Sequence, residues 1–506
     1  MSTKNTVNEL IRLYLQERDI LPQTSTVTLD GSIINVTSPG GTYSGTNGAA
    51  SGTTAIQNAL TQGGYILFKA GTYTVTSALT IPTNSWVQGT GWNSTLFQRT
   101  SGTIMSSTAD HVKVSDLGMS CTAASPATDG NLLFDGCDYV YVQNVRSTDS
   151  PSECIKARDC TLATFIGNYV ERSMINAGTG KAGIMFSTSA TGTSAQCSMI
   201  GNHAVDTGGE AFGVFAASGG TSNTLATITA NTSRITTTGN RGHIAVEGSS
   251  GNAGTASITG NDIHSDYYGI SVLNFQRTSI TGNSITHFSS TDALDGIRVS
   301  GASDYHTITG NTLTNIAQNG ILLEVSSRRL TVSGNTIINP SLKTTTTYDG
   351  IKVTPTGSAC RQPTITGNNI IDDQGSPTMQ YGINLTAGAS QIINANVQCN
   401  TIVGAVTAGM LESGTLTSPI IRNNIGYVTE NEGTGTINSG ATSATITHGL
   451  AYTPSRAEIT ITLGEDPTNT PGAIFVTSIG ATTFDVNSEN DPGASNLDFS
   501  WSVRRI

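Results

Sequence analysis

Charged and aromatic residues recur in a short phrase, x-Gly-apolar-x-apolar, that appears seven times between residues 182 and 385. In the copy DGIRVS, alternation along a strand points Ile297 and Val299 inward and Arg298 outward, with Asp295 at the start of the strand. If successive copies stack as neighbouring coils, their outward residues form rows. The row predicted at the strand start contains Arg241, Tyr268, Asp295, Asn319, Asp349 and Tyr381.

Two acids in that row are spaced for glycosidic chemistry. Asp295 and Asp349 are predicted to lie two coils apart, about 9.6 Å along the stack. Inverting glycosidases hold their carboxyl groups roughly 6.5–9.5 Å apart, so that one protonates the leaving oxygen while the other activates water. An alternative is that each Asp caps the turn before Gly and forms a surface ion pair. A third reading is sugar binding without chemistry.

Residues around the two acids are predicted to bind the substrate. Arg298 and Lys352 suit an acidic sugar, or keep a neighbouring carboxylate ionised. Tyr268 and Tyr381 offer flat faces to sugar rings, and Glu324 falls at a later outward position.

A second candidate cluster contains Glu210, His243 and Glu247. A histidine side chain can titrate near neutral pH, so a carboxylate within reach would make an acid/base pair. The alternative is a buried structural histidine. No repeated Gly-Gly-x-Gly-x-Asp phrase, Cys-x-x-Cys pair or Cys/His cluster appears, so we expect neither a metal nor a cofactor.

A second phrase, apolar-x-Gly-Asn-x-apolar, alternates with the first and predicts the scaffold. Its copies are 22 to 34 residues apart, which indicates a solenoid in which every coil holds at least two strands. We expect the asparagines to stack as a ladder at a tight turn, because Asn tolerates the left-handed backbone region. The predicted rungs are Asn168, Asn202, Asn231, Asn261, Asn283, Asn311, Asn335, Asn368 and Asn400.

The remaining segments divide the chain into three parts. A helix is predicted between Thr6 and Pro22, within an N-terminal part, residues 1–50, that would serve docking or trimerisation. A parallel β-helix is predicted over residues 51–430, with a short amphipathic helix at AIQNAL capping its first coil. Short alternating strands over residues 431–506 predict an antiparallel β-sandwich for trimerisation or glycan binding. The fold class is therefore all-β.

Composition excludes several function classes. Among the 506 residues only 12% are charged, and the net charge of −11 disfavours nucleic acid as a partner. No apolar run of about 18 residues predicts a membrane span. The start of the chain lacks the pattern of a secretion signal, so we expect exit from the cell by lysis or on a particle. The seven scattered cysteines are expected to be buried thiols.

The phrases AIQNAL…GGYILFKAGTYTVTSALTIP and VQGTGWNSTLF, followed by the Gly-Asn coils, carry a resemblance to a known superfamily. Residues 53–428 resemble the pectate-lyase-like right-handed parallel β-helix, especially phage tailspikes and depolymerases. The C-terminal segment is similar to domains of viral tail and fibre proteins that trimerise or bind sugar.

The resemblance implies a homotrimer on a virion tail, or outside the cell after lysis, that acts on capsule or lipopolysaccharide. The superfamily includes hydrolases, lyases, epimerases and non-enzymatic binders, so the fold alone leaves the reaction open. The expected activity is hydrolysis by Asp295 and Asp349. The alternatives are a metal-free lyase using Lys352, Arg298 or Tyr268, and a glycan-binding fibre without activity.

Overall fold

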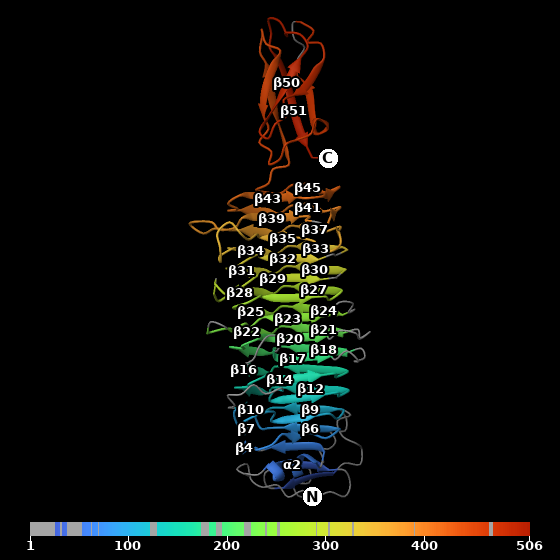
Figure 1. Ribbon diagram of the computed structural model, residues 1–506, viewed down its shortest axis with the longest axis vertical. Helices are drawn as coiled ribbons and strands as arrows, with labels where there is room; N and C mark the ends of the chain where they lie inside the picture. The colour runs from blue at the N-terminus through green and yellow to red at the C-terminus, as the bar shows by residue number, and fades with distance from the viewer. Residues whose placement is uncertain are drawn as a thin grey trace, which may run out of the picture.

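The structure is a computed structural model, in which strands stack into a long column, with residues 53–61 near one end and the C-terminal strands, residues 430–504, at the other (Figure 1). It describes residues 26–30, 33–37, 53–61, 63–68, 70–121, 129–173, 182–188, 195–216, 224–237, 240–249, 254–289, 291–301, 304–325, 328–388, 390–464 and 469–505. The helix predicted between residues 6 and 22 lies outside the described residues.

Each coil contributes one strand to each of three parallel sheets. Along each strand, inward apolar residues alternate with outward polar ones, so the apolar side chains fill the interior of the coil. Sheet A contains the antiparallel pair β1 (Thr26–Asp30) and β2 (Ile33–Thr37), then β3 (Gly64–Phe68), β6 (Ser85–Gln88), β9 (Val112–Ser115), β12 (Tyr139–Gln143), β15 (Leu162–Ile166), β18 (Ala195–Ile200), β21 (Thr224–Thr229), β24 (Thr255–Thr259), β27 (Arg277–Thr281), β30 (Tyr305–Thr309), β33 (Leu330–Ser333), β37 (Thr364–Thr366), β41 (Asn396–Gln398) and β45 (Ile420–Arg422).

Sheet B contains β4 (Gly71–Thr74), β7 (Thr95–Arg99), β10 (Gly118–Cys121), β13 (Arg146–Thr148), β16 (Tyr169–Glu171), β19 (His203–Val205), β22 (Thr232–Arg234), β25 (Asp262–Ser265), β28 (Ser284–His287), β31 (Thr312–Thr314), β34 (Thr336–Ile338), β38 (Asn369–Ile371) and β42 (Thr401–Val403). A small sheet in the last coils contains β36 (Cys360–Arg361), β40 (Ile392–Ile393) and β44 (Leu416–Thr417).

Sheet C carries the x-Gly-apolar-x-apolar phrase. Its strands are β5 (Leu79–Thr80), β8 (Met105–Ser107), β11 (Leu132–Asp135), β14 (Ile155–Arg158), β17 (Ala182–Thr188), β20 (Glu210–Ala216), β23 (Ile244–Gly248), β26 (Ile270–Leu273), β29 (Ile297–Gly301), β32 (Ile321–Val325), β35 (Ile351–Val353), β39 (Tyr381–Thr386) and β43 (Ala408–Ser413). The parallel β-helix that the repeats predict is thus confirmed.

The short helix α2 (Thr53–Thr61) covers the first coil, as the sequence predicts. Leu60 is fully buried, and Gln57 pairs with the backbone of Thr80 at the edge of sheet C. The Gln57 amide donates to the Thr80 carbonyl over 2.9 Å and accepts from the Thr80 N–H over 2.8 Å. These bonds satisfy backbone groups that would otherwise form an open strand edge.

The predicted asparagine ladder is present at the turn between sheets A and B. Asn261 Nδ2 donates to Asn283 Oδ1 over 2.9 Å, and Asn283 Nδ2 donates to Asn311 Oδ1 over 2.9 Å. Each Nδ2 also reaches a strand carbonyl, as from Asn283 to Ile258 over 3.0 Å. The same pattern runs from Asn168 to Asn400, and it continues to Asn424, which the sequence repeat does not identify.

We expected the asparagine of each turn to adopt the left-handed backbone conformation. The structure instead places the preceding residue in that conformation. Gly260 and Gly282 both have φ of 63°. At the two degenerate copies a residue with a Cβ takes this conformation, Ala230 and Cys399, each with φ of 56°. Such a conformation costs an L-residue roughly 1–2 kcal/mol.

Ala230→Gly is therefore expected to raise the free energy of unfolding by about 1 kcal/mol, and Gly282→Ala to lower it by a similar amount. A Cβ at Gly282 would meet nothing within 4 Å, so backbone strain alone sets the cost. Equilibrium urea unfolding measures both changes. Equal stability of all three chains would contradict the assignment of strain.

Cysteine burial agrees with the expectation at six positions and differs at one. Cys121, Cys137, Cys154, Cys160, Cys197 and Cys360 are buried, whereas Cys399 is exposed. Cys399 lies in a turn, at the place that glycine takes in other coils, where its side chain points to solvent.

Buried histidines make stability depend on pH. His287 Nδ1 accepts a hydrogen bond from the Ala317 N–H over 3.1 Å, and burial lowers the pKa of His287 to about 3. The ordinary pKa of a histidine is 6.5, so between about pH 6.5 and pH 3 the unfolded chain binds a proton at His287 and the folded chain does not. The free energy of unfolding is therefore unaffected by this histidine above about pH 6.5. It decreases as the pH falls toward 3, by about 1.4 kcal/mol per pH unit for each such histidine.

His287→Asn is expected to flatten this dependence, because Asn supplies an acceptor to Ala317 without binding a proton. The measurement is the apparent unfolding midpoint at constant scan rate between about pH 7 and pH 4. An unchanged slope would show that His287 does not stay neutral in the fold.

Beyond the coils, two antiparallel sheets form a small sandwich with its own apolar core (Figure 1). One sheet contains β46 (Glu430–Ile437), β51 (Leu497–Arg504) and β48 (Ile459–Leu463), and the other contains β47 (Ser443–Thr447), β50 (Thr483–Ser488) and β49 (Ile474–Thr477). Arg505 forms two 2.6 Å bonds with Glu412 of β43, and Tyr427 donates to Glu412 over 2.9 Å. These bonds tie the sandwich to the last coil.

Candidate functional site

Sheet C aligns the predicted rows as the repeats indicate, with one exception. Ile270, Ile297, Ile321, Ile351 and Ile383 pair in register from coil to coil. The residues two positions earlier therefore share the row at the strand start, which are Tyr268, Asp295, Asn319, Asp349 and Tyr381.

The exception is Arg241, which the sequence places in the same row. Ile244 pairs with Ile270, so Gly242, not Arg241, stands level with Tyr268. His243 fills the position that glycine takes in the other copies, and this moves Arg241 one residue out of register.

Asp295 and Asp349 are rungs of a buried hydrogen-bond ladder. Asn319 donates its N–H and Nδ2 to Asp295 Oδ1 over 3.1 and 2.7 Å, and its Oδ1 accepts the Asp349 N–H over 2.9 Å. Asp349 accepts from the Tyr381 N–H over 3.2 Å and from Asn384 Nδ2 over 2.8 Å. The exposed fraction is 3% for Asp295 and 0% for Asp349. Both acids thus help to hold their coils together.

Burial also changes the protonation of the two acids. It raises the pKa of Asp295 to about 6, against the opposing effects of the Asn319 hydrogen bonds and the Arg298 charge. Burial likewise raises the pKa of Asp349, opposed by Lys352, whose Nζ lies 3.5 Å from Asp349 Oδ2. A carboxyl group with a pKa near 6 suits general acid catalysis close to neutral pH.

Three predicted binding residues meet in one surface cluster beside Asp295. Arg298 donates from Nη1 to the Tyr268 hydroxyl over 2.6 Å, and from Nε and Nη2 to Glu324 Oε2 over 2.9 and 2.7 Å. The side chains of Arg298 and Glu324 are 32% and 29% exposed. Lys352 and Tyr381 instead contact Asp349 in the later coils. The structure therefore divides the predicted binding set in two.

The second candidate cluster adjoins the first through aromatic rings. The His243 ring lies 5.2 Å from the Tyr267 ring and 6.1 Å from the Tyr268 ring. His243 Nε2 lies 3.9 Å from Glu210 Oε1. Burial, together with the charge of Arg241, lowers the pKa of His243 to about 3, so this histidine is neutral at physiological pH.

Glu247 belongs to the same surface as Glu324. Both acids lie in one outward row, three coils apart. The row runs through Glu247, Leu273, Ser300 and Glu324. Burial raises the pKa of Glu247, while the charges of Arg298 and Arg241 oppose the increase.

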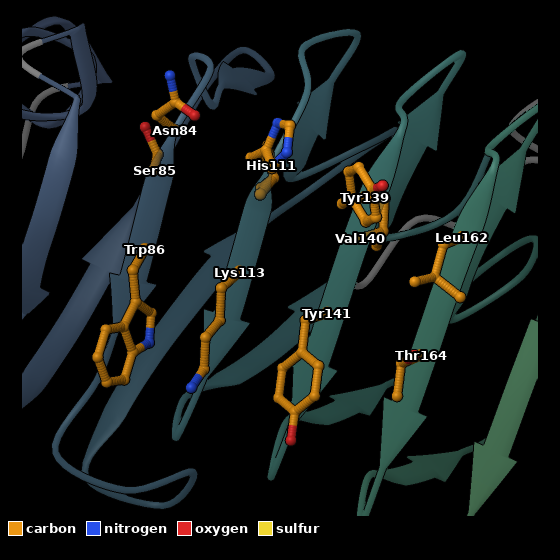
Figure 2. A pocket seen from close by; sticks show the side chains of 11 residues that line it. Asn84, Ser85, Trp86, His111, Lys113, Tyr139, Val140, Tyr141, Leu162 and Thr164 are labelled. Carbon is orange, nitrogen blue, oxygen red and sulfur yellow. The ribbon is translucent and has the colours of Figure 1, made fainter. Parts of the chain in front are cut away.

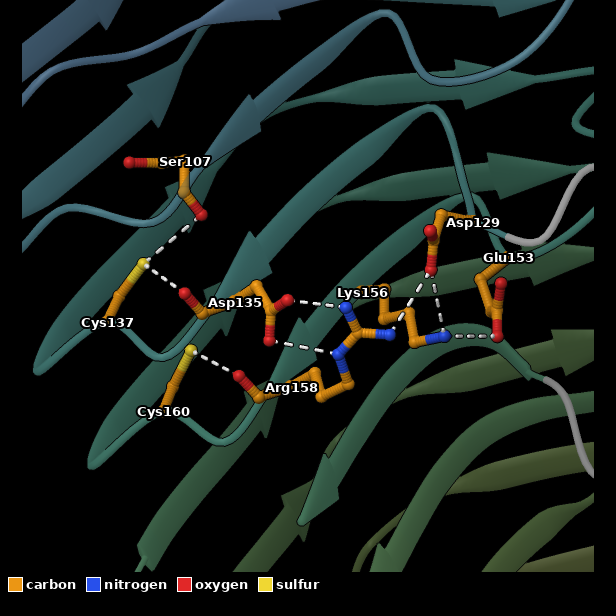
Figure 3. A network of polar contacts seen from close by, with 8 residues as sticks. All are labelled: Ser107, Asp129, Asp135, Cys137, Glu153, Lys156, Arg158 and Cys160. Atoms are coloured by element: carbon orange, nitrogen blue, oxygen red, sulfur yellow. Dashed lines mark hydrogen bonds and ion pairs between the residues drawn. The ribbon is translucent and has the colours of Figure 1, made fainter. Parts of the chain in front are cut away.

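Two features of sheet C were missed by the sequence reasoning. The Arg241 guanidinium stacks 4.4 Å from the Tyr267 ring centroid, and the doubled aromatic Tyr267–Tyr268 was the available signal. In earlier coils, Lys156 and Arg158 form a charged network with three acids (Figure 3). The acids of this network are Asp129, Asp135 and Glu153.

Comparisons with known proteins agree with this architecture. Residues 242–425 match the family described as "Right handed beta helix region". The tailspike protein gp49 from Pseudomonas phage LKA1 is 11% identical, with a TM-score of 0.57, over 89% of this chain and 92% of that one. The tailspike gp61 of Pseudomonas phage phi297 is also 11% identical, with a TM-score of 0.48, over 89% and 91% of the two chains.

A third similar structure is the catalytic domain of a GH87 alpha-1,3-glucanase, 14% identical with a TM-score of 0.38, over 73% of this chain and 69% of that one. No curated protein sequence matches the chain. Within the described residues, no helix combines the length and the apolar character needed to cross a membrane.

The family match and the structural likeness agree with the resemblance carried by the N-terminal phrases and the Gly-Asn coils. The chain has the right-handed parallel β-helix fold of the pectate-lyase-like type, and a phage tailspike is among its structural neighbours.

Proposed function

We propose that this chain is a tailspike-like protein that binds a cell-surface polysaccharide along sheet C and hydrolyses its glycosidic bonds. The observation that carries the proposal is the surface cluster of Tyr268, Arg298 and Glu324 beside the buried carboxyl group of Asp295. The tailspike fold makes a polysaccharide the reasonable substrate class. Lipopolysaccharide and capsule are the polymers that a virion meets at a cell surface.

In this mechanism Asp295 is the proton donor. Its raised pKa keeps a fraction protonated near neutral pH, so that it can deliver a proton to the leaving glycosidic oxygen. A proton on the leaving oxygen stabilises the departing alcohol, while positive charge develops on the sugar ring. Arg298, which already pairs with Glu324, can orient hydroxyl or carboxylate groups of the sugar.

Two carboxylates are candidates for the base that activates water. Asp349 has the predicted two-coil spacing from Asp295, but its side chain is 0% exposed. Glu324 is 29% exposed and lies in the coil next to Asp295. The greater exposure of its side chain favours Glu324 as the group that a water beside the substrate reaches. Asp349 then acts by holding Asn384 and Tyr381 of the next coil.

A lyase is the second candidate, and one contact favours it. The Tyr268 hydroxyl lies 2.6 Å from Arg298 Nη1, an arrangement in which the guanidinium neutralises a uronate and the ionised phenol takes the proton. Burial raises the pKa of Tyr268, which makes it a weaker acid and disfavours its ionised form at neutral pH. We therefore rank hydrolysis first.

Product analysis separates these activities. The chain is incubated with lipopolysaccharide O-chains from Pseudomonas, with alginate and with polygalacturonate, and the fragments are examined by mass and ultraviolet absorbance. Hydrolysis yields saturated fragments, each with one added water, whereas elimination yields unsaturated uronates that absorb. Binding without fragments would support the non-enzymatic fibre instead.

We also propose a homotrimer carried on a virion tail, with residues 1–50 and 431–506 serving docking and assembly. The fold of a phage tailspike supports this placement. Sedimentation equilibrium of the full chain should give three times the monomer mass of 52.3 kDa. A monomer at micromolar concentration would contradict the trimer.

A further inference from the structure

A hollow on the outer face of sheet A lies away from the sheet C site. It encloses about 260 Å³ and is lined by aromatic, cationic and apolar side chains (Figure 2). The principal lining residues are Trp86, His111, Lys113, Tyr139, Tyr141 and Leu162. Tyr139 is 48% exposed, so its ring is open to a ligand.

The register of sheet A explains how these residues meet. Trp86, Lys113, Tyr141 and Thr164 occupy one outward row on β6, β9, β12 and β15. The Lys113 ammonium lies 3.9 Å from the Trp86 ring centroid and 5.0 Å from the Tyr141 ring centroid. Two aromatic faces therefore flank a cation at successive steps of about 4.8 Å.

A parallel row deepens the hollow on one side. His111, which immediately precedes β9, and Tyr139, the first residue of β12, are neighbours, with ring centroids 4.6 Å apart and an angle of 32° between the planes. Leu162 follows in the same row. The hollow thus offers aromatic faces beside a cation and an imidazole.

The hollow continues into a second one along the same sheet. The second hollow encloses about 570 Å³ and shares Tyr139 and Leu162 with the first. It extends past Gln196 and Leu225 to Thr255 on β24. Together the two form a groove across seven strands, β6 to β24, which spans about 29 Å along the axis of the solenoid.

We propose that this sheet A groove is a second glycan-binding site, which holds several successive sugars of the polysaccharide that sheet C cleaves. The inference rests on the proposed function. A groove parallel to the axis fits a linear polymer. Aromatic faces pack against the C–H faces of pyranose rings, and the amide of Gln196 and the hydroxyls of Thr164 and Thr255 suit sugar hydroxyls.

The groove gives the protein a means of retaining its substrate. A polymer anchored on sheet A stays at a high effective concentration near sheet C, so its later bonds meet the site without a new encounter. Short oligosaccharides that fill only the sheet C site gain nothing from the groove. The proposal therefore predicts a difference between long and short substrates.

The test compares variants of the full chain. Tyr139→Ala/Tyr141→Ala and Lys113→Ala remove groove contacts, and Tyr305→Ala is the matched control. Tyr305 lies in the same row as Tyr139 but outside the groove, and it is 39% exposed. The probes are Pseudomonas lipopolysaccharide O-chains, alginate and polygalacturonate, each as polymer and as oligosaccharide. Calorimetry gives affinity and fragment release gives rate.

The double variant is expected to bind the polymer on the order of tenfold more weakly than the parent chain, with an unchanged rate on oligosaccharides. The Tyr305→Ala control should match the parent in both. Unchanged polymer affinity of the double variant, while the parent still cleaves, overturns the groove but not the proposed function. A parent that neither binds nor cleaves any probe overturns both.

Sedimentation of the same variants tests the other occupant, a second copy of this chain. If Tyr139→Ala/Tyr141→Ala converts an oligomer into monomers, the groove is a subunit interface and the proposal is wrong. An unchanged mass together with weaker polymer binding supports the glycan site.

Discussion

Replacing Asp295 with Asn is expected to lower the rate of polysaccharide cleavage by roughly 10²–10⁴-fold. Asn keeps the shape of Asp and can still accept the hydrogen bonds from Asn319, but it cannot donate an acidic proton to the leaving oxygen. Because the pKa of Asp295 is about 6, the rate of the parent chain should also fall as pH rises above that value. Fragment release across pH measures both effects.

Asp292→Asn is the matched control, since Asp292 is an exposed acid three residues before Asp295. It should retain the parental rate. Glu324→Gln and Asp349→Asn then identify the second carboxylate. We expect the larger loss for Glu324→Gln, because Glu324 is partly exposed and Asp349 is not. If Asp295→Asn cleaves at the parental rate, Asp295 is not the acid.

Replacing Asn283 with Ala is expected to destabilise the fold by several kcal/mol, the largest stability effect that we predict for a single residue. The change removes the acceptor for Asn261 N and Asn261 Nδ2, and the donor to the Ile258 carbonyl. Each buried polar group left without a partner costs about 1–3 kcal/mol. Urea unfolding followed by circular dichroism measures the loss.

The neighbouring exposed Ser284 supplies the control for that substitution. Ser284→Ala should change the free energy of unfolding by no more than about 0.5 kcal/mol, since its side chain faces solvent. A loss for Asn283→Ala no larger than that of Ser284→Ala would contradict the structural role of the ladder.

The scaffold could be predicted from sequence because each coil repeats the same local chemistry. The Gly-Asn phrase places a left-handed residue and an amide at every turn, so stacking follows from one coil to the next. The turn of Asn424, RNNIG, lacks the glycine before the asparagine, as the turns of Asn231 and Asn400 also do. It escaped prediction because it is the last rung, so no later copy of the phrase marks the repeat on its far side. Arg241 was misplaced because His243 replaces the glycine of its phrase, which shifts the register by one residue.

The candidate site could be predicted only in part, for a different reason. Sequence spacing identifies which residues share a row, as for Asp295 and Asp349, but not how deeply each is buried. Sequence spacing also does not predict the contact between the His243 and Tyr268 rings, because that contact depends on the direction in which the two side chains point. The groove begins at Trp86, Lys113 and Tyr139, whose coils lack the Gly-Asn phrase, so no repeat aligned these residues.

The most direct test of the sheet C assignment is fragment release from O-chain polysaccharide by the parent chain and by the double variant Asp295→Asn/Glu324→Gln, side by side. We predict saturated oligosaccharides from the parent and none from the variant, with polymer binding by both. Parental fragment release by the double variant would contradict it, and would place the chemistry elsewhere on the β-helix.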